Sequence, residues 1–147
     1  MPFLEQLTFA LAPLGYAGLA FCTVMAVYRT TPLTLWRIVV LIIAAHVTLV
    51  WHVRYGWQFS EATRNGYAGF LLFHGALAGI VVATVVGESM RRRLLVASFL
   101  VVTLGASAAV YRYDVVATYR YPVHAISILG LLGLGRRMMG VHRSAAD

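Results

Sequence analysis

Residues 45–75, AHVTLVWHVRYGWQFSEATRNGYAGFLLFHG, decide the fold of this chain. A polar connection separates two apolar segments, and each apolar segment contains a histidine. His46 lies eight residues before Arg54, and His74 lies ten residues after Arg64. With a rise of about 1.5 Å per residue, two antiparallel helices would hold both imidazoles roughly 12–15 Å below the same membrane surface. The stretch therefore predicts two histidines that face each other at similar depth.

The composition indicates an integral membrane protein. Of the 147 residues, 61% are hydrophobic and only 12% are charged, and the mean hydropathy is +0.79. A soluble domain of this length needs far more polar surface. The net charge of +7 comes from twelve arginines that fall between apolar runs, so we expect membrane lipids and not nucleic acid as their partners. Cys22 is the single cysteine, which excludes a disulfide framework and a CxxCH motif for covalent haem attachment.

The apolar runs predict an all-α bundle that forms one domain over residues 1–147. Transmembrane helices are expected over about 7–28, 35–53, 66–86, 94–111 and 115–135, followed by a short basic tail at 136–147. The last helix is ambiguous, because Pro122 suits a first helical turn and would leave a short span. Either the helix begins near Val115, with Arg120 snorkelling or paired, or four spans are followed by a re-entrant segment.

The distribution of arginines predicts the orientation. One side of the membrane receives eight of them, Arg29, Arg37, Arg91, Arg92, Arg93, Arg136, Arg137 and Arg143. The other side receives four, Arg54, Arg64, Arg112 and Arg120. The positive-inside rule places the first side in the cytoplasm, so we expect the N-terminus outside and the C-terminus inside a bacterial inner membrane. The first residues, MPFLEQL, lack the basic region of a cleavable signal peptide.

Four histidines fall in one leaflet of this topology, and ionisable side chains inside a membrane usually mark function. His46 and His52 are six residues apart, about 120° around a helix, so they do not face the same metal. The best single site pairs His46 with His74. A second site pairs His52 with His124, although these two also suit hydrogen bonds to carbonyls or a place among headgroups. Two imidazoles suit haem iron, and imidazole also accepts copper or zinc.

A flat macrocycle is favoured over a bare ion because no cysteine or carboxylate accompanies the deep pair. Phe70, Phe73 and the glycines of the third helix are expected to line the ring, with ordinary helix packing at Gly75-x-x-x-Gly79 as an equal alternative. Trp51, Tyr55 and Trp57 are expected to form an aromatic belt at the interface.

The four arginines of the histidine-bearing side have three candidate partners. Arg54, Arg64, Arg112 and Arg120 suit haem propionates, because guanidinium forks match carboxylates. They equally suit lipid phosphates, or ion pairs with Glu61 and Asp114. Asp114 beside Tyr113 and Arg112 also suits a proton path for a quinone near the surface.

The placement of His46, His52, His74 and His124 on three helices of a small bundle resembles the small membrane b-type cytochromes, a class that includes cytochrome b561 and bacterial di-haem membrane anchors. In that class such histidines ligate haem b, and the protein moves electrons between a quinol and a partner. The resemblance implies that His46 and His74 are axial ligands of one haem, with His52 and His124 as a second pair.

The leading functional prediction is therefore an electron-transfer protein or subunit. The first alternative is a non-catalytic accessory subunit of a larger membrane complex, or a homo-oligomer, that holds lipid, a chlorophyll-type pigment or partner helices. The second is a small membrane protein with a copper or zinc site built from the same histidines. Walker A, G-x-S-x-G and H-E-x-x-H motifs are absent from the sequence.

Overall fold

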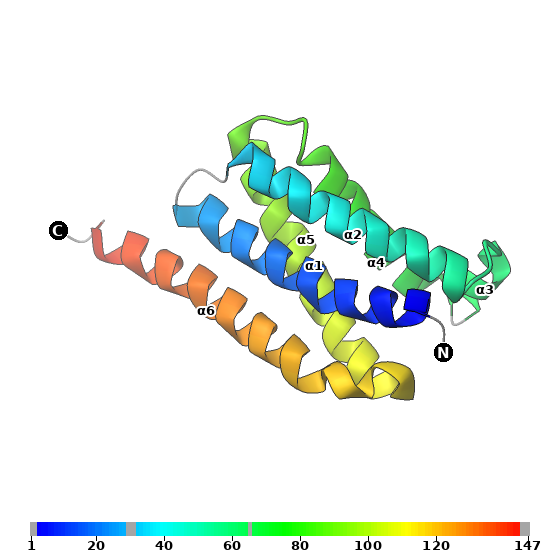
Figure 1. Cartoon of the computed structure of the whole chain (residues 1–147). Helices are drawn as coiled ribbons and strands as arrows, with labels where there is room; N and C mark the ends of the chain where they lie inside the picture. The colour runs from blue at the N-terminus through cyan, green and yellow to red at the C-terminus, as the bar shows by residue number, and fades with distance from the viewer. Residues whose placement is uncertain (1–2, 29–31, 65, 145–147) are drawn as a thin grey trace.

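The structure is a computed structural model that describes residues 3–28, 32–64 and 66–144, with side chains as far as residue 136. All regular structure in these ranges is helical (Figure 1). The elements are α1 (Phe3–Tyr28), α2 (Leu33–Val53), α3 (Phe59–Thr63), α4 (Tyr67–Val82), α5 (Glu88–Arg112), the 3-10 helix η1 (Asp114–Tyr119) and α6 (Arg120–Ser144). The prediction of an all-α membrane helical bundle is confirmed.

Within the described ranges, four segments are long and apolar enough to cross a membrane: 3–28, 33–53, 88–112 and 114–136. The fifth apolar helix, α4, has 16 residues and is the short one. At about 1.5 Å per residue it covers roughly 24 Å, less than a hydrocarbon core of about 30 Å. The sequence had placed the short span at the last helix instead. There, η1 leads directly into α6, and Arg120 is paired through its Nε, which donates to the carbonyl of Val110 at 2.9 Å.

Two helix boundaries differ from the prediction because of Arg91. The predicted helix over 66–86 ends at Val82, and the one predicted from residue 94 begins at Glu88. The Arg91 guanidinium donates from Nε to the carbonyl of Ala83 at 2.9 Å and from Nη2 to that of Val86 at 3.0 Å. These bonds satisfy two carbonyls just past the end of α4 and stabilise the short turn between α4 and α5. The predicted tail over 136–147 is helical as far as Ser144.

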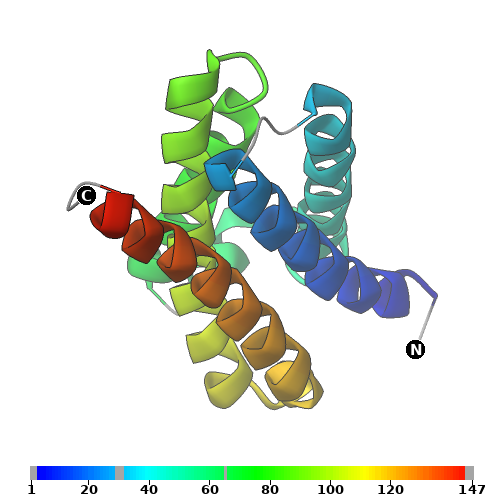
Figure 2. The same ribbon diagram turned by 90° about the vertical axis from the view of Figure 1, so that its left-hand side faces the viewer.

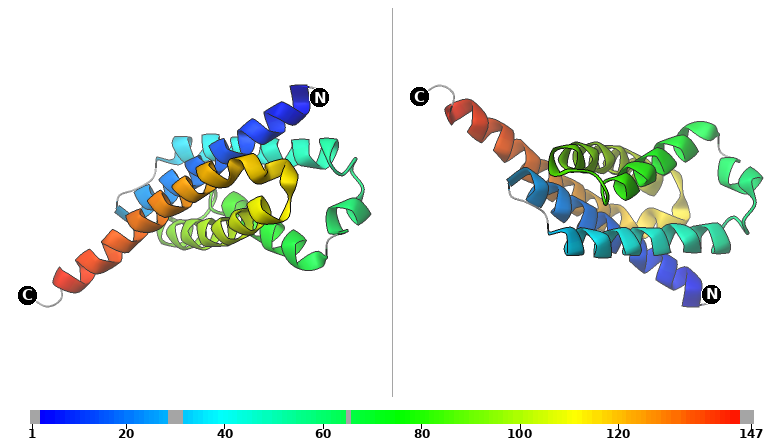
Figure 3. Two further views of the ribbon diagram at one scale, coloured as in Figure 1. Left: turned by 90° about the horizontal axis from the view of Figure 1, so that it is seen from below. Right: turned by 90° about the horizontal axis from the view of Figure 1, so that it is seen from above.

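Helix α1 is the centre of the bundle. It packs along α2, α5 and α6, while α4 packs along α5. Figure 2 shows α1 crossing between α2 on one side and α5 and α6 on the other. The N-terminus, α3 and η1 lie at one end of the bundle, here called the α3 end, and the α4–α5 connection lies at the opposite end (Figure 1). Figure 3 shows α2 and α4 diverging toward α3.

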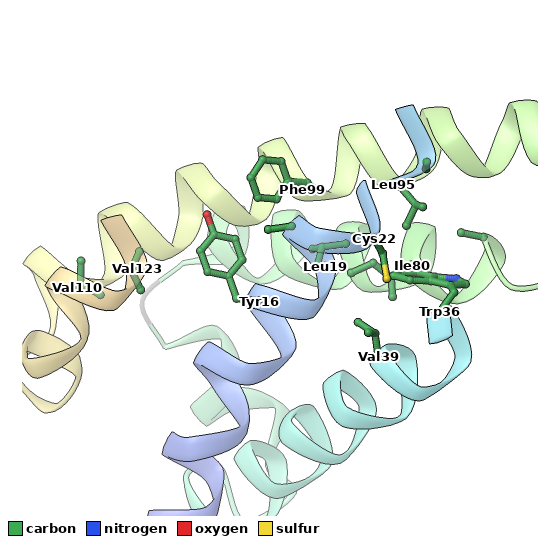
Figure 4. Packing of buried hydrophobic residues seen from close by; sticks show 13 residues of the cluster. Tyr16, Leu19, Cys22, Trp36, Val39, Ile80, Leu95, Phe99, Val110 and Val123 are labelled. Atoms are coloured by element: carbon green, nitrogen blue, oxygen red, sulfur yellow. The ribbon is translucent and has the colours of Figure 1, made fainter. Parts of the chain in front are cut away.

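The largest fully buried side chains of the apolar core lie between the middle of the bundle and the α4–α5 end, and the core continues through Val110 and Val123 toward the connection between α5 and α6. Leu19 and Cys22 of α1 pack between Trp36 of α2 and the side chains of Leu95 and Phe99 of α5 (Figure 4). These five side chains are at most 1% exposed. Close packing of these side chains holds α1, α2 and α5 together at this end.

A buried hydroxyl cluster joins three helices near the middle of the bundle. The Tyr16 hydroxyl of α1 is hydrogen-bonded to Thr103 Oγ1 of α5 at 2.7 Å and to Ser127 Oγ of α6 at 2.8 Å. Ser127 Oγ in turn donates to the carbonyl of Val123 at 2.7 Å. All three hydroxyls are thus satisfied in a region where water does not supply partners.

Candidate functional site between α2 and α4

His46 lies on the half of α2 nearer to α3 and is half-buried. Its Nδ1 is 3.0 Å from the carbonyl oxygen of Thr8 on α1. A carbonyl only accepts hydrogen bonds, so Nδ1 carries the proton and donates. Nε2 of this imidazole therefore carries the lone pair, which is the form that a metal ligand requires.

His74 on α4 has the same tautomer. Its Nδ1 donates to the carbonyl of Phe70, one turn earlier, at 2.8 Å. Its Nε2 accepts a hydrogen bond from the indole Nε1–H of Trp51 at 3.3 Å. The Phe70 ring also stacks on the imidazole, with 3.9 Å between centroids and 23° between planes. His74 is thus oriented on three sides by its own helix and by α2.

Trp51 connects α2 to α4 through its hydrogen bond to His74. These two helices diverge toward α3 (Figure 3). The Trp51 ring centroid lies 6.0 Å from that of His74 and 6.3 Å from that of Phe70, both edge-on. It also lies 5.8 Å from Tyr55 and stacks on Trp57 at 6.2 Å. The sequence had assigned Trp51 to an interfacial belt, and its bond to His74 was missed. The signal was its position one turn before the polar connection, on a helix whose neighbour carries a histidine.

The structure joins His46 to α1 and His74 to Trp51, which lies five residues further along α2, or about 7.5 Å. The two imidazoles thus have different partners in this arrangement. In the described part of the chain, no group of three or more His, Cys, Asp or Glu is placed to hold a metal ion. Ligation of one iron by His46 and His74, which needs only two groups, stays a prediction.

His52 and His124, the predicted second pair of ligands, lie in different surroundings. His52 is exposed at the end of α2. His124 on α6 is hydrogen-bonded through Nε2 to the Tyr111 hydroxyl of α5 at 2.9 Å, and their rings lie 5.5 Å apart. A joint role of His52 and His124 at a second metal also stays a prediction.

The four arginines divide into two pairs. Near the histidines, Arg54 Nη1 lies 3.9 Å from Glu5 Oε1 and Arg64 Nη1 lies 3.2 Å from Glu61 Oε2. The pairing of Arg64 with Glu61 was one of the alternatives that the sequence left open. Arg112 and Arg120 instead lie over the tyrosine rings of Tyr113 and Tyr111, at 5.7 and 5.1 Å from the centroids. Among the described side chains, neither of these two makes an ion pair.

Glu5 is a polar residue that the sequence analysis did not single out. It is 4% exposed, and its Oε2 has no hydrogen-bond partner among the described residues. Glu5 lies on the inward face of α1 with Thr8, Tyr16 and Leu19, all of them buried. The spacing of three or four residues between inward positions was the available signal. It places a carboxyl on the face of α1 that also accepts the His46 hydrogen bond.

Two of the residues expected to line a ring pack elsewhere. The Phe73 ring lies against Gly105 of α5, where a Cβ would meet its Cζ at 2.6 Å. A Cβ on Gly79 would lie 2.8 Å from Ser98 Oγ, so this glycine serves the contact between α4 and α5. Gly75 faces open space. Of the two phenylalanines expected to line the ring, only Phe70 lies against a histidine, His74.

Comparison with known proteins adds no relative, because no family model, curated protein or solved structure matches the chain.

Proposed function

We propose that this protein is a membrane electron-transfer protein, or an electron-transfer subunit, that binds a b-type haem through His46 and His74 between α2 and α4. One observation carries the proposal. Both deep imidazoles donate Nδ1–H to a backbone carbonyl, at 3.0 Å from Thr8 and 2.8 Å from Phe70. Metal-bound histidines are characteristically held in this way, since the bond fixes the tautomer and the ring orientation and makes Nε2 a better ligand.

The side chains around the pair fit a flat apolar group with an acidic edge. Trp51 and Phe70 supply aromatic surfaces next to His74. Arg54 and Arg64 lie in or beside the connection that contains α3, and their carboxylate partners Glu5 and Glu61 show that they bind such groups. Propionates would compete with these two glutamates for the guanidinium groups.

Binding requires one local change. His74 Nε2 accepts a hydrogen bond from Trp51, so ligation replaces this bond, and the indole turns away from the imidazole. His46 Nε2 is free of this requirement because its backbone bond uses Nδ1. A bound haem supplies one-electron chemistry, while the chain supplies ligation, orientation and exclusion of water. We propose a quinol as the electron donor and a bacterial inner membrane, with the N-terminus outside, as the location.

The decisive experiment is a dithionite-reduced minus air-oxidised visible spectrum of the detergent-purified protein, expressed with haem supplied. We expect sharp α and Soret bands that disappear in His46→Ala and in His74→Ala. His52→Ala is the matched control, because His52 is exposed on the same helix as His46. Retention of full band amplitude in this control indicates a single haem, and loss of about half indicates the second site with His124. A colourless wild-type protein would overturn the proposal.

A second candidate function is supported by the apolar surface of the bundle. Leu41 of α2, Leu71 of α4 and Leu129 of α6 are 69%, 64% and 70% exposed. Lipid, helices of other subunits or a second copy of this chain would cover these side chains in a non-catalytic accessory subunit. Colour that does not respond to dithionite favours a bound pigment. Stoichiometric copper or zinc without haem bands favours a metal site, and a colourless protein that copurifies with a partner favours a scaffold.

A further inference from the structure

A second polar site lies where α5 passes through η1 into α6. This α5–α6 corner consists of residues 110–124 and is built by Val110, Tyr111 and Arg112 of the last turn of α5 and by Arg120 and His124 of the first turns of α6. Tyr111, Tyr113 and Tyr121 are 64%, 38% and 88% exposed. The corner thus exposes three tyrosine rings and the side chain of Arg112, while Arg120 is half-buried.

The Arg120 guanidinium is held in place before any ligand binds. Its Nε donates to the carbonyl of Val110 at 2.9 Å, and its central carbon lies 5.1 Å from the centroid of the Tyr111 ring. The Tyr111 ring is itself fixed by the hydrogen bond from its hydroxyl to His124. The Nε bond and the ring contact together leave the terminal Nη groups for an external acceptor. Such preorganisation lowers the entropic cost of binding an anion.

Arg112 places a second guanidinium on the same turn of α5. It lies 5.7 Å from the centroid of the Tyr113 ring. Asp114 is the only acidic residue in the corner, and it is exposed. The ion pairs of the described side chains are Arg54–Glu5 and Arg64–Glu61, so the charges of Arg112 and Arg120 are not neutralised by a carboxylate. The corner therefore carries two unneutralised cations, unlike the arginines near the histidines.

The length of α5 places this corner at the level of lipid headgroups. Its 25 residues cover roughly 37 Å, which exceeds a hydrocarbon core of about 30 Å. The arginines of its first turns and Arg112 at its last residue therefore reach the two interfaces. Exposed tyrosines next to Arg112 and Arg120 are typical of residues at that level.

We propose that the α5–α6 corner binds the phosphate of an anionic phospholipid through Arg112 and Arg120. Guanidinium forks match phosphate oxygens in a bidentate way, and the net positive charge selects an anionic headgroup over a zwitterionic one. This site is independent of the haem proposed between His46 and His74, because it involves neither of these histidines and lies on α5 and α6.

The test is native mass spectrometry of the full chain in neutral detergent, titrated with phosphatidylglycerol or with phosphatidylcholine of the same acyl chains. We expect the tightest phosphatidylglycerol affinity to fall about fivefold in Arg112→Gln and on the order of thirtyfold in Arg112→Gln/Arg120→Gln. Phosphatidylcholine affinity is expected to stay unchanged. The matched control is Arg92→Gln/Arg93→Gln, which removes two exposed arginines from the opposite end and leaves the tightest site intact.

Three results would overturn the proposal: an equal loss in the Arg92→Gln/Arg93→Gln control, equal affinity for both lipids, or displacement of the lipid by inorganic phosphate at the same concentration. The last result would mean a soluble anion site. Loss of the Arg120 bond to Val110 weakens the corner itself. If Arg120→Gln does not fold, Arg112→Gln and Arg120→Lys carry the test, since both leave a positive charge in the corner. Unchanged affinity in Arg112→Gln would then count against the proposal.

Discussion

The apolar core and the histidine region between α2 and α4 differ in how deeply their side chains are buried and in the contacts that hold them. In the core, Leu19, Trp36 and Phe99 are at most 1% exposed and touch side chains of several helices. In the histidine region, His46 and Trp51 are only half-buried, and His52 is exposed. The core is held by close packing, whereas the histidine region is held by directional hydrogen bonds and ring contacts. We infer that the core fixes the fold and that the histidine region has room to rearrange.

Helix α2 belongs to both regions. Its buried side chains, Trp36 and Val39, both lie in its first half. In its second half, His46 is hydrogen-bonded to Thr8 of α1, and Trp51 is hydrogen-bonded to His74 of α4. A single helix is therefore anchored at one end and adjustable at the other. Mutations in the two regions are expected to separate stability from ligand access.

The largest expected effect is on stability, in Gly130→Ala. A Cβ at this position of α6 would lie 2.3 Å from Cζ of Phe99, and the Phe99 ring is 0% exposed and stacked on Tyr16. Because the ring has no free space to enter, α6 must move away from α5. We expect a loss of about 2 kcal/mol in the free energy of unfolding, measured by denaturant or thermal titration in detergent micelles.

Two other glycines supply matched controls for this substitution. Gly135→Ala places a Cβ in open space on the same helix and is expected to be neutral or slightly stabilising. Gly105→Ala brings a Cβ to 2.6 Å from Cζ of Phe73, but Phe73 is 41% exposed and its ring can turn outward. We expect less than about 1 kcal/mol here. Equal losses in Gly130→Ala and Gly105→Ala would contradict the difference in packing between the buried Phe99 ring and the partly exposed Phe73 ring.

An intermediate effect is expected in Tyr16→Phe. The substitution removes the hydroxyl that is bonded to Thr103 and Ser127, while the ring stays on Phe99. Hydrogen bonds between membrane helices contribute about 0.6 kcal/mol each on average, so we expect a loss of about 1 kcal/mol. A double-mutant cycle with Thr103→Val measures the coupling directly.

The matched control is Tyr28→Phe, since the Tyr28 hydroxyl also bonds α6, at the carbonyl of Gly133, but on the exposed surface. Its loss is expected to be smaller. A coupling energy of zero between Tyr16 and Thr103 would mean that the cluster does not hold the three helices together.

Hydropathy and arginine positions were sufficient to predict the helical bundle, because a long apolar run has few alternatives to a helix in a membrane. Its exact spans were harder to predict. Leu94 begins an apolar run, yet α5 begins at Glu88, since helix propensity and the capping bonds of Arg91 do not appear in hydropathy. The same bonds explain why α4 stops at Val82, four residues before its apolar run does.

The candidate site was less predictable, for a geometric reason. Counting residues from the polar connection predicted equal depths for His46 and His74. That count did not include α3 and the irregular residues around it, which lie between α2 and α4. The residue of α2 that contacts His74 is consequently Trp51. Counting along two helices gives their relative register only when the connection between them is regular. The backbone bond of His46 depends on Thr8 of α1, 38 residues earlier in the chain, which no local pattern reveals.

The smallest effect on stability, and the most specific one, is expected in Trp51→Phe. Phenylalanine keeps an aromatic ring beside Phe70 but removes the indole N–H that is bonded to His74 Nε2. The loss in unfolding free energy is expected to be about 0.5–1 kcal/mol. The freed nitrogen is expected to react faster with diethyl pyrocarbonate, which modifies unprotonated imidazole, by roughly fivefold if the bond is worth about 1 kcal/mol. Peptide mass spectrometry measures the rate for each histidine separately.

His46 is the internal control in the same sample, because its bond to Thr8 uses Nδ1 and is untouched by the substitution. Its rate is expected to stay constant. If His74 reacts as fast in the wild-type protein as in Trp51→Phe, the indole does not protect Nε2 from the reagent. Solvent exposure alone then determines how accessible His74 is. If only His74 accelerates, Trp51 is the group that must move before His74 can bind a metal. Trp51→Phe is then expected to bind haem more tightly than the wild type, because the bond that ligation must break is already absent.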